Sequence, residues 1–347
     1  MKDKYAIPRL VADVGGTNAR FALETAPRRF EVVMVLACND YASLRAATQT
    51  YLSSAVANTV YSGQIEHAAI AIADPIDGDA VSMTNHHWSF SIAVLREELG
   101  LATLLVVNDF TALAMALPHL SASQRRQVGS GIELPGRPIG LIGPGTGLGV
   151  SGIFPVGARW VALASEGGHA TFAPADEVEV GILRFLWREY GHVSAERLLS
   201  GTGLELIYRA LTGQPLGAAA ITRRALDTSC PECVKTVECF CSVLGTVAGN
   251  VALTLGATGG MYVGGGIVPR LGHMFLQSPF RARFESKGRL SPYVARIPTY
   301  LITEEYPAFL GVSAMLSEQL MTTPDHEAKK LEMVRNVVPQ DYAQNVA

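Results

Sequence analysis

The stretch Asp13-Val14-Gly15-Gly16-Thr17-Asn18 separates two apolar runs that each predict a β-strand, Arg9–Asp13 and Ala19–Leu23. Two glycines between strands predict a hairpin, because glycine enters turn conformations at little steric cost. Such a turn leaves its backbone N–H groups open to an anion, so we expect it to face phosphate groups. The alternative is an ordinary β-turn capped by Asp13. The missing Gly-Lys-Ser/Thr excludes a P-loop, and the strand that follows distinguishes the turn from the strand-to-helix turn of a dinucleotide-binding fold.

A second glycine-rich turn lies farther along the chain, at Gly143-Pro144-Gly145-Thr146-Gly147-Leu148-Gly149. It follows the apolar run Ile139–Ile142, which again predicts a strand. One such turn is weak evidence, because glycine loops also serve as plain hairpins. Two of them, each with a threonine, predict duplicated halves that grip a polyphosphate from both sides of a cleft.

The composition indicates a soluble protein of two domains. The 347 residues are too many for one ordinary core, and 48% hydrophobic with 17% charged residues can fill a substantial interior. A net charge of −3 without a basic stripe argues against nucleic acid as the main partner. No uninterrupted apolar stretch reaches the ~18–20 residues that span a bilayer. The acid in Met1-Lys2-Asp3-Lys4 argues against a signal peptide, so we expect a cytoplasmic protein without a membrane partner.

The five cysteines do not suggest a disulfide framework, because their number is odd and the chain is large. Cys38 stands alone, and the others form a cluster of two pairs: Cys230, Cys233, Cys239 and Cys241. A zinc site is one interpretation of the cluster. The apolar run Val234–Leu255, however, predicts a helix that contains the second pair, and a helix cannot wrap that pair around a metal shared with Cys230. We therefore expect buried thiols.

Strand and helix patterns alternate along the chain. In the first third, further strands are predicted at Phe30–Ala37, Ala68–Ala73 and Leu104–Val107, and helices at about Ser43–Leu52, Ile92–Leu99 and Thr111–Leu117. A polar segment, about Ser121–Pro138, predicts a crossover. The second part has predicted strands at Ile139–Ile142, Val150–Phe154, Trp160–Ser165, Gly260–Val263 and Thr299–Ile302, and helices near Val178–Tyr190, Gly203–Leu211 and Cys230–Leu255. We expect a helix from Pro307 to return to the first domain.

Val107-Asn108-Asp109-Phe110 places a carboxylate at the end of an apolar strand and directly before a helix. Ligands of open α/β sheets collect at this edge. A carboxylate there can accept the proton of a substrate hydroxyl while that oxygen attacks phosphorus. Asp109 also satisfies the preference for a helix N-cap, and spacing alone does not separate the two roles.

The run Ser165-Glu166-Gly167-Gly168-His169 predicts a second polar site, because its glycines let Glu166 and His169 turn toward one point. A carboxylate can bind two vicinal hydroxyls, which suits a sugar, and Glu196 would be another carboxylate of that kind. His192 and Glu196 are spaced like two metal ligands on a helix, but no third ligand is evident. Taken alone, Glu196 fits a surface ion pair better.

Val263-Gly264-Gly265-Gly266-Ile267-Val268-Pro269 follows another predicted strand. Its three glycines permit a large flat group to lie against the backbone. The alternative, a flexible loop tip, agrees poorly with the apolar residues on both sides.

Together these motifs resemble bacterial ATP-dependent glucokinases, in order, from about Arg9 to Leu316. The stretches that carry the resemblance are DVGGTNAR from Asp13, Thr84-Asn85-His86, Asn108-Asp109-Phe110-Thr111, Gly143 to Gly149, Glu166-Gly167-Gly168-His169, HVSAERLLSG from His192, and GGGIVPR from Gly264. One departure is Asp74 in Ile72-Ala73-Asp74-Pro75, where relatives usually carry a small residue.

The resemblance implies an α/β fold of the two-domain, ribonuclease-H-like (hexokinase/actin-like) kind, with an active-site cleft between the domains. It implies ATP as phosphoryl donor, Mg²⁺, D-glucose as acceptor and a homodimer. The ATP phosphates would meet Asp13, Gly15, Gly16, Thr17, Gly145, Thr146 and Gly147, with Asp13 near Mg²⁺ through water, and the adenosine would border Gly264, Gly265 and Gly266. Glucose would meet Asn108, Asp109, Glu166, His169 and Glu196, with Asp109 as the base for the 6-hydroxyl.

We expect residues 1–118 with about 307–330 to form a small domain, 119–306 a large domain, and 331–347 a polar tail. The nearest rival function is a kinase of another hexose or amino sugar. Members of the repressor/open-reading-frame/kinase group would add a cysteine-rich zinc loop, which the residues after His169 lack. A sugar-sensing regulator would need a helix-turn-helix before the first strand. An actin-like filament or chaperone ATPase would not need a polyol-binding set.

Overall fold

The computed structural model describes residues 7–84 and 86–322. Its contacts divide the chain into two units: unit 1, which runs to Ala112 and resumes at Ala308, and unit 2, Leu113–Pro307. The first boundary lies at Ala112, whereas the sequence suggested residue 118. Asn85 and the expected tail, 331–347, lie outside the described residues.

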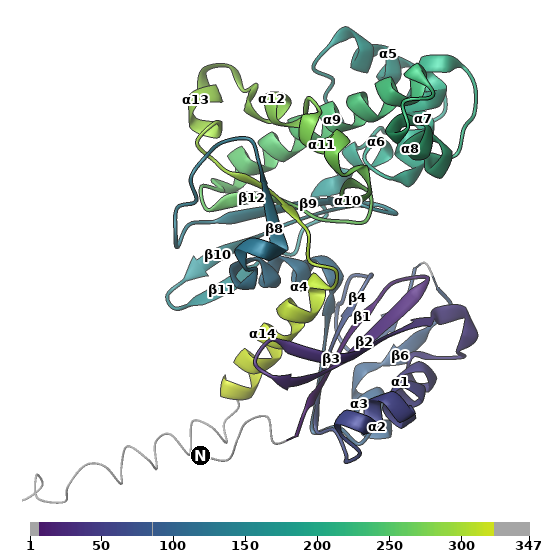
Figure 1. The fold of residues 1–347 in the computed structure, drawn as a ribbon, viewed down its shortest axis with the longest axis vertical. Coiled ribbons are helices and arrows are strands. Elements are labelled where there is room, and N and C mark those ends of the chain that lie inside the picture. Colours follow the sequence, from purple (N-terminus) through teal and green to yellow (C-terminus); the bar gives the residue numbers. More distant parts are fainter. Residues whose placement is uncertain (1–6, 85, 323–347) are drawn as a thin grey trace, which may run out of the picture. The chain divides into compact units, whose positions relative to one another are not determined.

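Unit 1 contains a five-stranded sheet of order β3-β2-β1-β4-β7 (Figure 1). Its strands are β1 (Arg9–Val14), β2 (Asn18–Ala26), β3 (Arg29–Ala37), β4 (His67–Ile72) and β7 (Thr103–Asn108). β1, β2 and β3 form an antiparallel meander, whereas β4 pairs in parallel with both β1 and β7. The carboxyl ends of β1, β4 and β7 therefore meet at one edge, which carries Asp13, Asp74 and Asp109.

The helices of unit 1 are α1 (Leu44–Ser53), α2 (Ala55–Val60), α3 (Ile92–Glu98), α4 (Asp109–Ala116) and α14 (Pro307–Thr322), with α4 and α14 crossing the unit boundaries. Ser43 caps α1 by accepting a hydrogen bond from the Ala46 N–H at 3.2 Å, as its sequence position predicts. A short hairpin of β5 (Ala80–Ser82) and β6 (Ser89–Ser91), which the strand patterns did not predict, precedes α3. The core is built from sheet residues such as Leu10, Phe21 and Ile70.

Unit 2 contains a six-stranded sheet of order β11-β10-β9-β12-β13-β8. Its strands are β8 (Arg125–Val128), β9 (Ile139–Pro144), β10 (Leu148–Val156), β11 (Arg159–Ala162), β12 (Gly260–Val263) and β13 (Thr299–Ile302). β9, β10 and β11 form a second antiparallel meander, and β12 is parallel to β9 and β13. The two meanders and their parallel neighbours repeat one topology, so the predicted duplication is confirmed at the level of strand order.

The segment expected to be only a crossover contains β8, which pairs antiparallel with β13. The prediction failed because Arg125-Arg126-Gln127-Val128 has little apolar character of its own. The strand forms at the sheet edge, where partnership with β13 supplies the hydrogen bonds.

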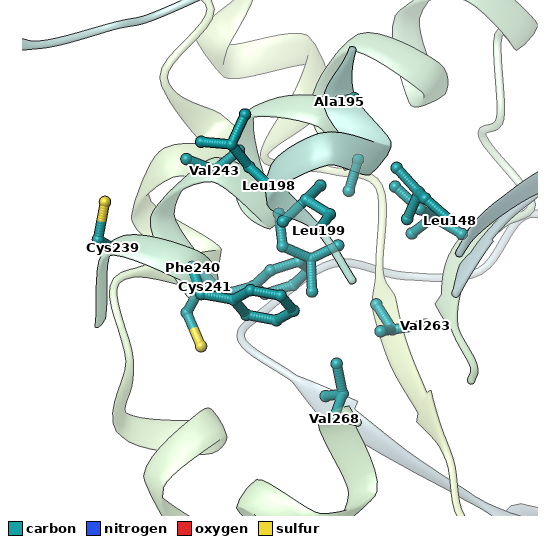
Figure 2. Packing of buried hydrophobic residues seen from close by; sticks show 14 of the residues in the cluster. Leu148, Ala195, Leu198, Leu199, Cys239, Phe240, Cys241, Val243, Val263 and Val268 are labelled. Carbon is teal, nitrogen blue, oxygen red and sulfur yellow. The ribbon is translucent and has the colours of Figure 1, made fainter. Parts of the chain in front are cut away.

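The helices of unit 2 are α5 (Glu177–Leu186), α6 (Ala195–Leu198), α7 (Gly201–Thr212), α8 (Ala218–Leu226), α9 (Pro231–Leu255), α10 (Val268–Leu271), α11 (His273–Gln277), α12 (Phe280–Glu285) and α13 (Ser291–Val294). The 25-residue α9 is the central helix of this unit. Phe240 of α9 packs in one cluster with Leu199 and with Val263 of β12 (Figure 2). Of the described helices, α9 alone is long and apolar enough to cross a bilayer by length and composition, and 61% of its most apolar window is buried within the protein. That burial marks α9 as a core helix.

Candidate active site

The first glycine turn joins β1 to β2 in three residues, Gly15, Gly16 and Thr17. The Gly15 N–H donates to the Asn18 carbonyl at 3.0 Å, and the Cys38 N–H donates to the Thr17 carbonyl at 2.8 Å. Among the residues that the structure describes, the N–H groups of Gly16 and Thr17 have no hydrogen-bond partner. Two successive unpaired N–H groups are what a turn needs to bind an anion.

Asp13 lies in β1, two residues before Gly15 and opposite Arg20 of β2. Its Oδ2 atom accepts a hydrogen bond from Arg20 Nη1 at 3.1 Å. Burial nevertheless raises the pKa of Asp13, and the Arg20 charge and hydrogen bond only partly oppose this rise. The sequence motif includes Arg20 but assigns it no role. Arg20 becomes the partner of Asp13 because the register of β1 and β2 places the two residues opposite each other.

Asn108 and Asp109 lie at the junction of β7 and α4, and Asn108 is the residue that caps the helix. Its Oδ1 accepts from the N–H groups of Phe110 and Thr111 at 3.0 and 3.1 Å. The cap role considered for Asp109 therefore belongs mainly to Asn108. Asp109 Oδ1 accepts from the Phe110 N–H at 2.8 Å and from Asn108 Nδ2 at 3.1 Å. Within the described chain, no group donates to Asp109 Oδ2.

The pKa of Asp109 is raised to about 7, chiefly by burial and then by the negative charge of Asp13, with a smaller contribution from Asp74. Hydrogen bonds from the backbone oppose the rise. A carboxylate with a pKa near 7 is well matched to general-base catalysis at neutral pH, because it is both available and basic enough to take a proton.

Asp74 follows β4 and is only 4% exposed. Its Oδ1 accepts two hydrogen bonds from Thr84, at 2.8 Å from the N–H and 2.5 Å from Oγ1, whereas its buried Oδ2 has no partner among the described residues. Its carbonyl accepts a hydrogen bond from Asn108 Nδ2 at 3.3 Å. The sequence noted Asp74 only as a departure. Asp74 follows a predicted strand, as Asp109 does, and the pairing of β4 with β7 brings the ends of these two strands together. The shared position after a strand could have predicted that Asp74 lies beside Asp109.

The second glycine turn joins β9 to β10, also in three residues, Gly145, Thr146 and Gly147. The Gly145 N–H donates to the Gly147 carbonyl at 2.8 Å, and within the described part of the chain the Thr146 and Gly147 N–H groups have no partner. The pattern repeats that of the first turn, although the two sequences differ. This repetition supports the prediction that both turns serve the same kind of ligand.

Glu196, at the start of α6, reaches the second turn. Its Oε2 accepts from the Leu148 N–H at 2.9 Å, and a Cβ on Gly147 would lie 2.5 Å from that oxygen. Its Oε1 lies 3.8 Å from His169 Nδ1. Glu196 is therefore not a lone surface residue, and it joins two of the predicted site segments within unit 2.

Glu166 and His169 flank the two glycines of a short 3₁₀ helix, Gly167–His169, and both side chains are exposed. A Cβ on Gly168 would lie 2.0 Å from the Leu148 carbonyl oxygen, so glycine lets this segment pack against the start of β10. His192 lies before the Ser194 cap of α6, and its Nε2 is 3.1 Å from Thr171 Oγ1. His192 and Glu196 thus do not share a helix face, which contradicts the spacing that suggested a metal pair.

The third glycine run follows β12 and lies against the second turn. Gly265 has φ +77°, and a Cβ there would be 2.3 Å from the Pro144 carbonyl oxygen. Gly266, in contrast, has no heavy atom within 4 Å of its Cβ position. The open backbone of this run is therefore at Gly266, whereas Gly264 and Gly265 lie close to neighbouring atoms.

No group of three or more His, Cys, Asp or Glu side chains that could hold a metal occurs among residues 7–84 and 86–322. Mg²⁺ does not need one, because it usually keeps several waters and binds one or two carboxylates together with substrate phosphates. Asp13, a partly exposed carboxylate two residues before Gly15 of the first turn, fits that mode of binding.

The glucokinase family model matches residues 10–319, which covers most of the chain. This chain belongs to the glucokinase family. A glucokinase of Chromobacterium violaceum is 53% identical over 326 residues, which is 92% of each chain. The bifunctional protein glk of Paraburkholderia xenovorans is 56% identical over 320 residues, 90% of this chain and 49% of that protein. This glucokinase-family chain thus spans about half the length of such bifunctional relatives.

Among solved structures, a glucokinase from an Antarctic psychrotroph superposes with a TM-score of 0.82. It is 36% identical, and the match covers 90% of this chain and 99% of that one. The likeness confirms the expected α/β fold of the hexokinase/actin-like class for this glucokinase-family member.

Proposed function

We propose that this protein transfers the γ-phosphoryl group of ATP to the 6-hydroxyl of D-glucose, giving glucose 6-phosphate and ADP. Membership of the glucokinase family supports the proposal. The single observation that carries it is Asp109, a half-buried carboxylate whose pKa is raised to about 7 and whose Oδ2 accepts no hydrogen bond among the described residues.

In the proposed reaction, Asp109 accepts the proton of the 6-hydroxyl as that oxygen forms its bond to phosphorus and the bond from phosphorus to the ADP oxygen breaks. Asn108 holds Oδ1 of Asp109, so the second oxygen is the one that faces the substrate. Phosphoryl transfer needs little covalent help from a protein, and depends on alignment of the three reacting atoms and on charge neutralisation.

The phosphates of ATP would be bound by the open N–H groups of both glycine turns. The residues of these turns are Gly15, Gly16 and Thr17 in the first, and Gly145, Thr146 and Gly147 in the second. Asp13 would hold Mg²⁺ through water, and the ion would neutralise phosphate charge. The backbone of Gly264, Gly265 and Gly266 would border the adenosine.

The sugar hydroxyls would be bound by Asn108 together with Glu166, His169 and Glu196. The 3.8 Å approach of His169 and Glu196 supports this assignment, because it presents a ring nitrogen and a carboxylate together. Glu166 is exposed and forms no side-chain hydrogen bond among the described residues, so its carboxylate is available to two hydroxyls. A cytoplasmic homodimer is part of the same proposal, and sedimentation of the purified protein tests the dimer.

The decisive experiment compares Asp109→Ala with Asp77→Ala, a change of an exposed carboxylate in the same unit. We expect Asp109→Ala to lower kcat at least about 10²-fold, the usual contribution of a general base, with binding of an ATP analogue nearly unchanged. Asp77→Ala should keep wild-type turnover. Equal activity of the two variants would remove Asp109 from the reaction. A coupled assay across hexoses and phosphoryl donors separates glucokinase from a kinase of another hexose or amino sugar.

A further inference from the structure

The cysteine cluster has no part in the proposed kinase reaction, and its two pairs differ in geometry. Cys239 and Cys241 lie two positions apart inside α9, where successive residues are rotated by about 100°. Their sulfur atoms accordingly point away from each other (Figure 2). Both thiols are buried, which raises their pKa values to about 12. This pair is buried, as the sequence predicted for the whole cluster, whereas Cys230 is only half-buried.

Cys230 and Cys233 are arranged differently, because Cys230 lies just before α9 and its side chain reaches the backbone of Cys233 in the first turn. Cys230 is the N-cap of the helix, and its Sγ accepts a hydrogen bond from the Cys233 N–H at 3.4 Å. Pro231 occupies the first helical position, where its fixed φ favours this turn. Residues three apart within a helix have Cβ atoms about 5–6 Å apart, wider than the roughly 3.5–4.5 Å that a disulfide spans. Cys230, however, has an extended backbone at the N-cap (φ −142°, ψ 105°), so its side chain is free of the helical spacing and can turn toward Cys233.

The two thiols also differ in access. Cys230 is half-buried, whereas Cys233 is fully buried, so a reagent meets Cys230 first. A thiolate on Cys230 would gain the Cys233 N–H and the positive end of a 25-residue helix dipole. Glu232 opposes this gain, since its Oε2 accepts a hydrogen bond from Cys230 Sγ at 3.4 Å. Burial, together with the contact to Cys230, raises the pKa of Cys233 to about 11, so Cys233 keeps its proton at neutral pH.

We propose that Cys230 and Cys233 form a redox-active dithiol that a low-molecular-weight disulfide converts to an intramolecular disulfide in the first turn of α9. The Cys230 thiolate attacks one sulfur of the reagent, and the reagent's S–S bond breaks to release one thiol. Cys233 then loses its proton and attacks Cys230 Sγ in the mixed disulfide, which releases the second thiol. Two protein thiols are thereby oxidised by two electrons while one reagent disulfide is reduced to two thiols.

Trypsin provides a direct test, because cleavage after Arg224 and Lys235 yields the peptide Ala225–Lys235, which contains Cys230 and Cys233 and no other cysteine. The reduced, folded protein is incubated with glutathione disulfide, alkylated with iodoacetamide under denaturing conditions, and digested. We expect this peptide to escape alkylation and to lose two hydrogens. Cys239 and Cys241, which fall in a different peptide, should react at least tenfold more slowly.

Single variants test the order of the two steps. Cys233→Ser should accumulate glutathione on Cys230, whereas Cys230→Ser should leave Cys233 unmodified while the fold is intact by circular dichroism. A wild-type peptide that stays doubly alkylated, or that retains glutathione on Cys230, would overturn the proposal. The wild-type result stands even if a variant fails to fold, and no step depends on kinase activity.

Discussion

At the scale of single residues, the protein places three carboxylates at the edge where β1, β4 and β7 end. Asp13 has Arg20 as a partner, and Asp74 is held by Thr84. No cation among the described residues pairs with Asp109, and the negative charges of Asp13 and Asp74 add to burial in raising its pKa to about 7. The other two carboxylates at this edge of the sheet therefore make Asp109 more basic.

This arrangement predicts the acid limb of the pH profile. Only ionised Asp109 can accept a proton, so kcat/KM should fall as pH drops and be half-maximal near pH 7. Asp74→Asn keeps the oxygen that Thr84 contacts but removes a negative charge, which lowers the pKa of Asp109. We expect the acid limb to move to lower pH. Initial rates from pH 5 to 9 check this, and an unmoved limb would show that Asp74 does not influence the base.

At the scale of elements, the glycine runs perform two separable tasks. Gly265 allows β12 to end against the β9–β10 turn, since its φ is +77° and a Cβ would lie 2.3 Å from the Pro144 oxygen. Gly266 next to it has open space and serves no packing role. The two glycines differ because the backbone of Pro144 lies against Gly265 and no other atom of the described residues lies against Gly266.

The two neighbouring glycines therefore form a matched pair for mutation. Gly265→Ala should lower the free energy of unfolding by about 2–4 kcal/mol, because it combines left-handed strain with a clash. Gly266→Ala should change stability by no more than about 0.5 kcal/mol, yet raise the KM for ATP several-fold if adenosine lies against this backbone. Urea unfolding and initial-rate kinetics measure both. Equal stability losses would contradict the assigned division of tasks.

At the scale of the whole molecule, the last described helix, α14, packs on the unit that contains the first strands. Ser313 Oγ donates to Glu24 Oε1 of β2 at 2.6 Å, and Arg9 Nη1 of β1 donates to Ser317 Oγ at 2.7 Å. Glu24 is completely buried. Unit 1 is thus assembled from both ends of the described chain, and its buried charges depend on the distant helix.

Ser313→Ala tests this dependence. It removes a donor to a buried carboxylate, which should cost about 1.5–3 kcal/mol of unfolding free energy. Met321→Ala, at a side chain that is 53% exposed on the same helix, serves as the control and should cost no more than about 0.5 kcal/mol. Thermal and urea unfolding measure the free energy of unfolding of the Ser313→Ala and Met321→Ala variants. A loss no larger than that of the control would mean that α14 contributes little to unit 1.

The sequence by itself determined the features that depend on neighbouring residues: the glycine turns, the strands that flank them, and Asn108-Asp109 at a strand-to-helix junction. Local chemistry sets these features, since apolar runs form strands and glycine permits the turns. Strands β12 and β13 were accordingly predicted at their observed bounds.

Only the tertiary structure decided which distant residues meet. It pairs polar β8 with β13, brings Asp74 beside Asp109, gives the helix cap to Asn108, and sets Glu196 against the second turn. These contacts join residues far apart in the chain, so they follow from sheet order and packing, which local sequence patterns do not encode.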